Sequence, residues 1–406
     1  MLRFKNSPAF LIACLIICLA SCNKTMQSPR DMGTRPHDSG EILENVVYEN
    51  GQDGYQCYRI PAIVKAPNGD LLAFAEARRK DCGDFGDVDM VLKRSTDNGK
   101  SWGKLQMAVD FGDNQAGNPA PVFDMTDPAY PKGRLFLFYN TGTAHEADVR
   151  KGQAVREVWY RTSTDNGNSW SEGVNITLQT SRPQAPSVNP AYTFKEDWRS
   201  YANTPGHALQ IQNGPYRGRL FVAANHSAGP PQENSRDYIA PAFYSDDHGK
   251  TFKLSPNLDY AGGNEATAAE TSDGSLLFNF RNQSGDAKYR LQGFTRNAGE
   301  SWDEVRVMKD LPDPVCQGSI ISFQPKKGKP VLVFSNANSQ TKRENLTLRS
   351  STDNGQTWSS GKVIYPGPAA YSDLVIQENG NIGVLYEKDD YKRISYAQVE
   401  AKWLME

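Results

Sequence analysis

Ser95-Thr96-Asp97-Asn98-Gly99-Lys100-Ser101-Trp102 is the stretch of sequence that decides the fold, because the chain repeats it. The Asn-Gly pair supplies the positive φ angles that a tight hairpin turn requires. The Asp carboxylate can accept hydrogen bonds from backbone N–H groups two residues further on, which locks the turn. The closing aromatic residue brings a large apolar area to bury. One such octad predicts one hairpin and nothing more.

The octad recurs three times in full and once in a degraded form, in which Asn297 replaces the Asp. The copies begin at unequal intervals along the chain, and so many copies are unlikely to arise by chance. Repetition of this kind predicts a radial or stacked array of similar sheets. The later copies are Ser163–Trp170, Ser245–Phe252, Thr295–Trp302 and Ser351–Trp358.

The rest of the chain after residue 44 has the composition of an all-β protein. Short apolar runs alternate with Gly, Asn, Asp and Pro, and helical periodicity is rare. Residues 45–406, divided by six, give units of about 60 residues, which is enough for four strands and their loops. We therefore predict a six-bladed β-propeller, with seven smaller blades as the competing arrangement. The apolar runs include Leu71–Ala75, Arg134–Tyr139, Arg219–Ala223 and Val331–Phe334.

Residues 1–22 have the features of a targeting segment. A basic start is followed by an uninterrupted apolar run over residues 9–20, too short to span a bilayer in the usual way. The run ends in Leu19-Ala20-Ser21-Cys22, which resembles the lipobox of bacterial lipoproteins, with ordinary cleavage after a small residue as the alternative. The resemblance implies an exported bacterial lipoprotein, at the periplasmic face or the cell surface, anchored to the membrane only through lipid on Cys22. Residues 23–44 are polar and are predicted to be a tether.

Composition argues against several functions. Lys and Arg total 45 and Asp and Glu total 47, so no global field would attract nucleic acid. The five histidines are scattered without ligand spacing, and the aspartates that follow Arg78 do not fit an EF-hand loop. We therefore expect no metal site and no nucleic-acid partner.

A group of motifs suggests a family. Tyr58-Arg59-Ile60-Pro61 is followed by Phe74-Ala75-Glu76-Ala77-Arg78, and Asp84 lies six residues after Arg78. The repeated octads are of the kind known as Asp-boxes. Together with Arg-Ile-Pro, a strand ending in Glu-x-Arg and the Asp after it, they look like the sialidase (neuraminidase) family. The resemblance extends over nearly the whole of residues 45–406. The Asp-boxes alone are less specific, since other β-proteins carry them.

The resemblance implies residues that bind substrate. Sialidases hold the substrate carboxylate with three arginines. The third of these matches Arg343 in this sequence, with Arg349 as the alternative. Arg78 is similar to the arginine that contacts the 4-hydroxyl region of the sugar. Asn118, in Asn118-Pro119-Ala120-Pro121, resembles a segment that lines the N-acyl side. The three arginines that match are Arg59, Arg281 and Arg343.

The resemblance also implies three catalytic residues. Tyr371, which follows Arg343 along the chain, matches the family's tyrosine, and Glu265, which precedes Arg281, matches its glutamate. Asp84 matches the acid/base by its spacing from Arg78. Asp81 and Asp87 are the alternatives to Asp84, and Glu76 and Glu270 are expected to be structural.

The chemistry of sialic acid explains these residue types. Its carboxylate lies on the anomeric carbon, and planar guanidinium groups bind a carboxylate in bidentate fashion at any working pH. A carboxylate nucleophile would be repelled by that anion, whereas a neutral phenol would not. The phenol of Tyr371 has an ordinary pKa near 10 and needs a base, the role assigned to Glu265. Asp84 would protonate the leaving oxygen, for which a raised pKa is expected.

The implied function is an exo-α-sialidase that hydrolyses terminal sialic acid from glycoproteins, glycolipids and oligosaccharides, without a cofactor. A trans-sialidase, or an enzyme that forms an intramolecular anhydro product, is one alternative. A non-catalytic sialic-acid-binding propeller is another, but such a protein would be expected to lack Tyr371, Glu265 or Asp84.

Three cysteines remain after the targeting segment, and an oxidising compartment allows them one disulfide at most. Cys57 and Cys82 each lie two residues before a candidate site residue, so a bond between them is a hypothesis. Cys316 has no assigned role.

Overall fold

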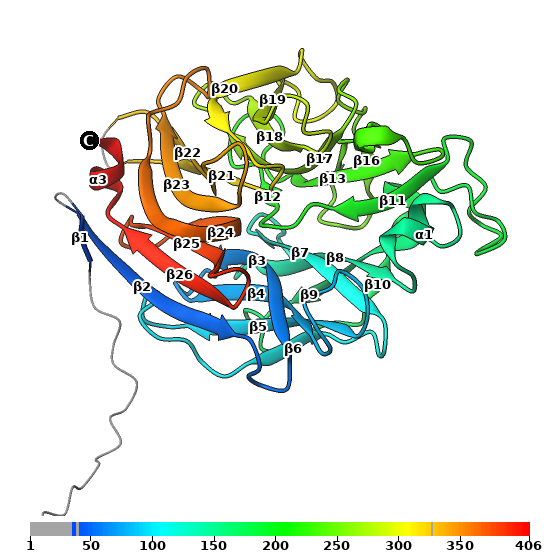
Figure 1. The fold of residues 1–406 in the computed structure, drawn as a ribbon, viewed down its shortest axis with the longest axis horizontal. Helices are drawn as coiled ribbons and strands as arrows, with labels where there is room; N and C mark the ends of the chain where they lie inside the picture. The colour runs from blue at the N-terminus through cyan, green and yellow to red at the C-terminus, as the bar shows by residue number, and fades with distance from the viewer. Residues whose placement is uncertain (1–34, 38–39, 326–327) are drawn as a thin grey trace, which may run out of the picture. The chain divides into compact units, whose positions relative to one another are not determined.

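A computed structural model describes residues 35–37, 40–325 and 328–406, all within a unit that runs from Thr34 to Glu406. The described chain is mostly β, as predicted, and its strands pair into four sheets (Figure 1). The predicted signal peptide and Cys22 lie outside the described residues. Among the residues described, no helix has the length and apolar character needed to cross a membrane. The described helices are short: α1 (Glu146–Arg150), α2 (Thr177–Thr180), the 3₁₀ turn η1 (Glu233–Ser235) and α3 (Ala401–Met405).

Two of the sheets contain eight strands each in the described ranges. One runs in the order β10 (Val174–Asn175), β9 (Arg156–Ser163), β8 (Arg134–Gly142), β7 (Gln115–Asp124), β5 (Val88–Ser95), β4 (Leu71–Arg78) and β3 (Cys57–Lys65), with β6 (Gln106–Val109) paired to β5. The other runs in the order β1 (Arg35–His37), β2 (Gly40–Glu49), β26 (Arg393–Val399), β25 (Ile382–Lys388), β24 (Lys362–Ile376), β23 (Glu344–Ser351), β22 (Val331–Ala337) and β21 (Ser319–Phe323).

The other two sheets come from the middle of the chain. One contains β11 (Trp198–Asn203), β13 (Leu220–Ala228), β15 (Ala242–Ser245) and β16 (Lys253–Leu254), with β12 (Leu209–Gln210) and β14 (Tyr238–Ile239) paired to β13. The last has the order β17 (Gly263–Glu270), β18 (Leu276–Asn282), β19 (Tyr289–Thr295) and β20 (Arg306–Pro312). The four apolar runs picked out from the sequence fall in β4, β8, β13 and β22, and this confirms the strand prediction.

Strand β2 joins the first described part of the chain to the last. It pairs antiparallel with β26, from Leu43 opposite Gln398 to Glu49 opposite Arg393, and Figure 1 shows blue β2 beside red β26. The tether predicted over residues 23–44 was therefore wrong at its end, because β2 begins at Gly40. Pairing with β2 supplies hydrogen-bond partners to a strand edge that would otherwise be open.

The octads form hairpins between consecutive antiparallel strands, and this confirms the prediction from the repeats. The first copy connects β5 to β6, and its Asn98 and Gly99 have φ angles of 59° and 82°. The degraded copy connects β19 to β20 and adopts the same conformation, with φ angles of 52° at Ala298 and 95° at Gly299. The hairpin therefore depends on a backbone conformation that Asn-Gly adopts at low cost but does not require Asn.

The octad aspartate reaches further than predicted. Oδ1 of Asp97 accepts the backbone N–H of Ser101, four residues on, at 2.9 Å, and Oδ2 accepts the hydroxyl of Ser101 at 2.6 Å. The predicted reach of two residues was wrong because the loop closes over four residues. The closing aromatic behaves as predicted: Trp102 packs edge to face on Tyr396, with ring centroids 5.4 Å apart.

We expect Asp165→Ala, in the second octad, to lower the stability of the protein. The carboxylate accepts the N–H and the hydroxyl of Ser169 at 2.9 and 2.5 Å. Because these bonds are exposed to water, their loss should cost about 1 kcal/mol, or roughly 2 °C in Tm. Asp165→Asn should cost less, since Asn297 makes the equivalent two contacts with Ser301 in the degraded octad.

The stability lost in Asp165→Ala should also depend on pH. Desolvation raises the pKa of Asp165, but hydrogen bonds from Ser169 and Ser163 outweigh it and lower the pKa to about 2. A depressed pKa stabilises the fold above the unfolded value of about 3.9, and that stability is lost as pH falls toward 2. The Tm values of Asp165→Ala and wild type should therefore differ at pH 7 and converge as the pH falls from about 4 toward about 2. A difference in Tm that does not change with pH would contradict this explanation.

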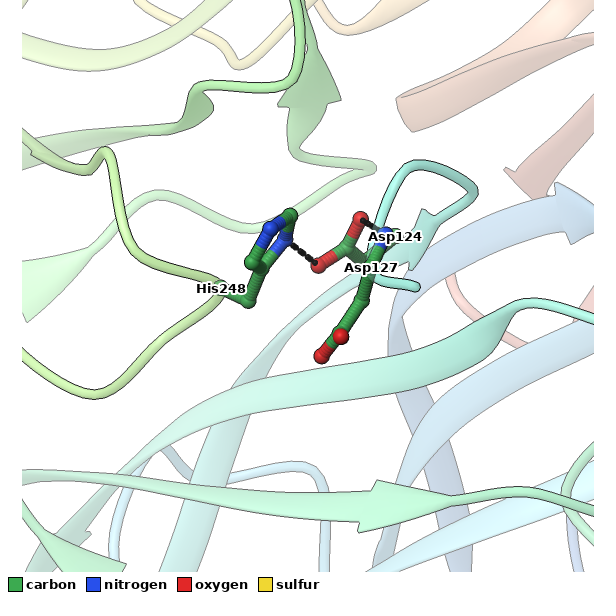
Figure 2. A group of neighbouring side chains, drawn as sticks. All are labelled: Asp124, Asp127 and His248. Carbon is green, nitrogen blue, oxygen red and sulfur yellow. Dashed lines mark hydrogen bonds and ion pairs between the residues drawn. The ribbon is translucent and has the colours of Figure 1, made fainter. Parts of the chain in front are cut away.

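A histidine and two aspartates form the candidate metal cluster that the described residues contain (Figure 2). His248 belongs to the third octad, and its Nδ1 lies 2.8 Å from Oδ2 of Asp124 at the end of β7. The other oxygen of Asp124 accepts Nε2 of Gln210 at 2.6 Å, and Asp127 accepts Nη2 of Arg134 at 3.0 Å. Protein donors already satisfy both carboxylates, so the cluster links two sheets and gives no reason to propose an ion.

Buried polar contacts hold the strands that carry the candidate site. Asp373, on β24 two residues after Tyr371, is fully buried. Its Oδ2 accepts the backbone N–H groups of Ile63 on β3 and His207 at 2.8 and 2.9 Å, and its Oδ1 accepts the hydroxyl of Ser319 on β21 at 2.7 Å. Because a buried carboxylate must be hydrogen-bonded, these contacts hold β24 in place relative to β3 and β21.

Candidate active site

A single pocket of about 430 Å³ brings together all the site residues predicted from the motifs. They lie on β3, β4, the β4–β5 loop, β7, β17, β18, the segment before β23, and β24. Residues from both ends of the described chain thus meet at one place. The pocket residues are Arg59, Arg78, Asp84, Asn118, Glu265, Arg281, Arg343 and Tyr371.

Tyr371, Glu265 and Arg281 are in direct contact. The Tyr371 hydroxyl lies 2.6 and 2.8 Å from the two carboxylate oxygens of Glu265, to which it donates. Nη1 of Arg281 donates both to Oε2 of Glu265, at 2.7 Å, and to the Tyr371 oxygen, at 2.8 Å. The phenol therefore has a proton acceptor on one side and a cationic donor on the other, which is the arrangement of an activated nucleophile and its base.

The environment of Tyr371 keeps its hydroxyl protonated. Burial and the Glu265 carboxylate raise the pKa of Tyr371 well above 10, while Arg281 and Arg343 act to lower it. The guanidinium carbons of Arg59 and Arg343 each lie 5.6 Å from the centre of the Tyr371 ring. Because phenolate forms only when its proton leaves, these cations would stabilise it at the moment of reaction.

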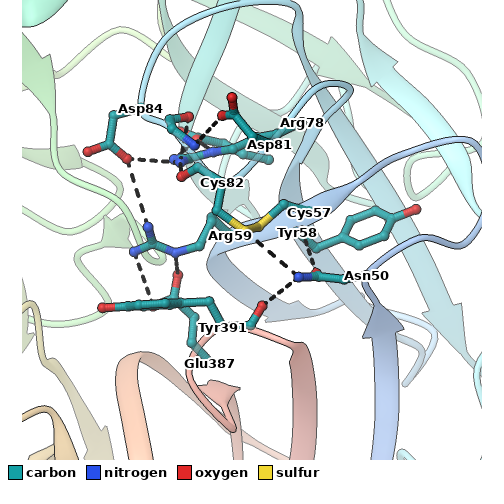
Figure 3. The surroundings of a disulfide bond; sticks show 12 residues. Asn50, Cys57, Tyr58, Arg59, Arg78, Asp81, Cys82, Asp84, Glu387 and Tyr391 are labelled. Carbon is teal, nitrogen blue, oxygen red and sulfur yellow. Dashed lines mark hydrogen bonds and ion pairs between the residues drawn. A yellow bond between two sulfur atoms is a disulfide. The ribbon is translucent and has the colours of Figure 1, made fainter.

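Arg59 is held by a glutamate that motif reasoning missed. Its Nε and Nη2 donate to Glu387 on β25 at 2.5 and 3.3 Å (Figure 3). Glu387 also accepts the backbone N–H groups of Ile60 and Tyr371, at 2.9 and 3.1 Å. Ile60 has a φ of 58°, a strained conformation for a β-branched residue, and Glu387 stabilises it.

Arg343 occupies the position expected of the third arginine. Nη2 donates to the carbonyl of Val315 at 3.0 Å, and Nη1 donates to the hydroxyl of Tyr391 at 3.1 Å. The ring of Tyr391 stacks on Arg59, 4.2 Å from its guanidinium carbon, and so separates the two cations. The rival Arg349 lies outside the pocket, where it donates to side chains of Asn336 and Asn338.

Glu76, expected to be structural, orients two pocket residues. Its Oε2 accepts Nε and Nη2 of Arg78 at 3.2 and 2.7 Å, and its Oε1 accepts the backbone N–H of Asn118 at 2.9 Å. Asn118 has a φ of 56°, which asparagine tolerates better than most residues. Glu270 lies outside the pocket and accepts backbone N–H groups of Gln212 and Asn213, so it is structural as predicted.

Asp84 is the pocket member of the three candidate aspartates. Its Oδ1 lies 2.9 Å from Nη1 of Arg78 and 3.8 Å from Nη1 of Arg59, and its side chain is 69% exposed. Asp81 accepts the N–H of Gly83, and Asp87 pairs with Arg79, both outside the pocket.

The expectation of a raised pKa for Asp84 was wrong. Partial desolvation by its neighbours raises the pKa of this mostly exposed carboxyl, but Arg78 and then Arg59 outweigh that effect and hold the pKa below its usual 3.8. Both arginines lie on strands neighbouring the loop, an arrangement that spacing along the chain did not reveal.

The predicted disulfide between Cys57 and Cys82 is confirmed. Cys316 is a free, buried thiol that packs with Ile60 and Tyr371 beneath the pocket, and burial raises its pKa to about 11. A protonated thiol in that position packs as a small apolar group.

Part of the pocket wall is formed by residues that no sequence motif identified. Helix α1 contributes Glu146, which pairs with Arg156 on β9 at 3.4 Å and accepts the hydroxyl of Tyr238. Glu387, by contrast, had a signal: like Glu76, it is a carboxylate near the end of an otherwise apolar strand. A charge that closes an apolar strand needs a buried partner, and in both cases the partner is a pocket arginine.

Residues 69–384 match the family described as a BNR repeat-like domain. The chain belongs to this family. Its five octads lie on hairpins of the sheets whose strands line the pocket.

Known proteins similar to this BNR-repeat chain are sialidases. It is 34% identical to a sialidase of Micromonospora viridifaciens over 98% of its own length, and it spans 60% of the length of that relative. A Hadza microbial sialidase superimposes with a TM-score of 0.75 at 25% identity, covering 89% of this chain and 69% of the other. The intramolecular trans-sialidase of Ruminococcus gnavus, solved with oseltamivir carboxylate, shares the fold, with a TM-score of 0.66, 19% identity and coverage of 88% and 97%. The resemblance to sialidases inferred from the motifs is confirmed.

Proposed function

We propose that this protein is an exo-α-sialidase that hydrolyses terminal sialic acid from sialylated glycans with retention of configuration. The observation that carries the proposal is the contact between the Tyr371 hydroxyl and both oxygens of Glu265, within a pocket that also holds the arginines predicted to bind the substrate carboxylate. The similarity to proteins named sialidases supports the same reaction class.

The arginines Arg59, Arg281 and Arg343 would bind the carboxylate of the sugar. Each donor to a charged acceptor contributes roughly 1.5–3 kcal/mol net. Their own partners keep them in place before substrate arrives: Glu387 for Arg59, Glu265 for Arg281, and the Val315 carbonyl for Arg343. This preorganisation means that little side-chain entropy is lost when the anion binds.

Two displacements at the anomeric carbon would give retention. In the first, Glu265 takes the phenol proton, the Tyr371 oxygen bonds to the anomeric carbon, the glycosidic bond breaks and Asp84 protonates the leaving oxygen. In the second, Asp84 takes a proton from water, the water oxygen bonds to the anomeric carbon, the bond to Tyr371 breaks and Glu265 returns the proton.

Substrate binding should raise the pKa of Asp84. The substrate carboxylate neutralises the charge of Arg59, one of the cations that hold the pKa below its usual range. Since kcat/KM reports the free enzyme and kcat the complex, the alkaline limb of kcat on sialyllactose should lie at higher pH than that of kcat/KM. Profiles from pH 3 to 8 test this expectation, and limbs that coincide would contradict it.

We also propose six propeller blades. The pairings support this count because they divide into antiparallel groups that begin at β3, β7, β11, β17, β21 and the second half of β24, the last of which takes in β25, β26 and β2. The first five groups each carry one octad on the hairpin between their last two strands.

For the N-terminal region we propose, from the sequence, that residues 1–22 act as a lipoprotein signal peptide and that Cys22 is lipidated. It rests on the Leu19-Ala20-Ser21-Cys22 motif and the preceding apolar run. Palmitate labelling of the expressed protein, lost in Cys22→Ala, would test it. The tether would then run from residue 23 to the start of the described strands.

Hydrolysis is tested with the purified wild-type protein, a 4-methylumbelliferyl sialoside and sialyllactose. We expect free sialic acid from both, with the α anomer appearing first by NMR. The β anomer first would refute the double displacement, and no release would refute the enzyme assignment. An anhydro sugar or a sialylated acceptor as main product would instead support the transferase alternatives, a comparison prompted by the shared fold of the trans-sialidase.

A further inference from the structure

The proposed acid lies on a loop with little structure of its own. Residues 79–87 connect β4 to β5 without forming a strand, and residues 79–84 are exposed. A general acid works only when it lies within hydrogen-bond reach of the leaving oxygen. Something must therefore hold this loop in place over the pocket.

Two interactions hold the loop near Cys82, and they start from the adjacent strands β3 and β4. Cys57 on β3 lies directly opposite Arg78 on β4 in the strand register. Nη1 of Arg78 donates to the carbonyls of Cys82 and Gly83, at 2.5 and 2.8 Å, and to Asp84 at 2.9 Å. The disulfide ties Cys82 to Cys57 from the other side, as Figure 3 shows.

The anchoring end of the disulfide is rigid. Cys57 is fully buried, whereas Cys82 is exposed. Nδ2 of Asn50 lies 3.8 Å from the sulfur of Cys82 and donates to the carbonyl of Tyr391 at 2.9 Å. Oδ1 of the same Asn50 accepts the backbone N–H of Tyr58, next to Cys57, at 3.1 Å. The disulfide is thus fixed to the strand that carries Arg59.

We infer that the Cys57–Cys82 disulfide is a positioning element for the acid, holding Asp84 beside Arg59 and Arg78. This inference rests on the proposed function. The simpler interpretation is that the bond only stabilises the fold, as any disulfide that closes a loop of this length can do. The two interpretations differ in what they say about the first displacement, which kcat/KM reports, because loss of an acid slows that step only where the leaving group needs a proton.

The test compares wild type with Cys57→Ala/Cys82→Ala, as full chains, on two substrates. We expect kcat/KM on sialyllactose to fall by about tenfold, a fraction of what a general acid contributes. On the 4-methylumbelliferyl sialoside, whose leaving group departs without help, the fall should stay within about twofold for the same reason. Asp165→Ala, destabilised at a site remote from the pocket, is the matched control and should show no difference between substrates.

A second measurement links the effect to Asp84. In an Asp84→Ala background, removing the disulfide should cause no further loss on sialyllactose, because coupled residues are not additive. Should the cysteine variant fail to fold, folded wild type is treated with dithiothreitol, which becomes a cyclic disulfide as the protein gains two thiols, and is then alkylated. The same difference between substrates is expected.

Equal losses on the two substrates, no loss on either, or a full further loss in the Asp84→Ala background would each overturn the positioning role while leaving the proposed function intact. A wild-type protein inactive on both substrates would instead remove the proposed function, and the inference with it.

Discussion

Tyr371→Phe is expected to lower kcat on sialyllactose by at least about 100-fold, because the substitution removes one oxygen atom and with it the nucleophile. The phenol oxygen contacts both Glu265 and Arg281. The ring packs with Ile60 and Ala370, and phenylalanine keeps those contacts. The fold should therefore survive, so the loss would belong to the chemistry.

Binding provides the control for Tyr371→Phe. The three arginines remain, so the affinity for free sialic acid, measured by titration calorimetry, should change by no more than about threefold. A sialosyl fluoride with a second fluorine beside the anomeric carbon should add its sugar mass to the peptide that contains Tyr371 in wild type and leave the variant unlabelled. Labelling of another residue, or normal turnover by the variant, would refute the tyrosyl intermediate.

Motifs identified the pocket residues that occupy fixed places in short sequence patterns. Arg59 was identified from Arg-Ile-Pro, and Glu265 and Arg281 were identified by their resemblance to sialidase residues; the latter two lie on strands that are consecutive along the chain. Such residues are recognisable because hairpin geometry keeps neighbours along the chain close together in space. The octads were recognisable for the same reason, since the contacts that close the turn lie within the octad itself.

Residues that act across the fold were not recognisable in this way. Glu387 binds Arg59 across 328 positions, and Tyr391 stacks on the same arginine. Neither lies in a motif, and although Glu387 stands near the end of an apolar strand, only the contact of β25 with β3 shows that its partner is Arg59. The pKa of Asp84 could not be predicted for the same reason. The direction of its shift depends on the distances to Arg78 and Arg59, which spacing along the chain does not give.

The edges of the fold were hard to predict for a different reason. The tether was predicted from the polar composition of residues 23–44 as a whole, which hides the short apolar pair Ile42-Leu43 that pairing with β26 makes part of a strand. The number of blades is limited in the same way, because β24 is one continuous strand of 15 residues that pairs with β23 in its first part and β25 in its second. An average unit length cannot show that one strand serves two groups.

Asp84→Ala should lower kcat/KM on sialyllactose by about 100-fold or more, the scale on which general acids act. The loss of kcat/KM on a 4-methylumbelliferyl sialoside should be much smaller, because kcat/KM covers only the first displacement, in which an aryl oxide leaves without a proton. Arg78 keeps its bonds to Glu76 and to the carbonyls of Cys82 and Gly83, so the pocket should hold its geometry. Steady-state rates on both substrates measure the difference.

Asp81→Ala is the matched control for Asp84→Ala, because Asp81 lies in the same exposed loop and contacts Gly83 rather than the pocket. It should retain wild-type activity on both substrates to within about threefold, as surface substitutions outside the machinery usually do. A large loss for Asp81→Ala with normal turnover by Asp84→Ala would exchange the two assignments. Equal losses by Asp84→Ala on the natural and the aryl substrate would mean that the carboxylate orients the arginines and transfers no proton, since only proton transfer depends on the leaving group.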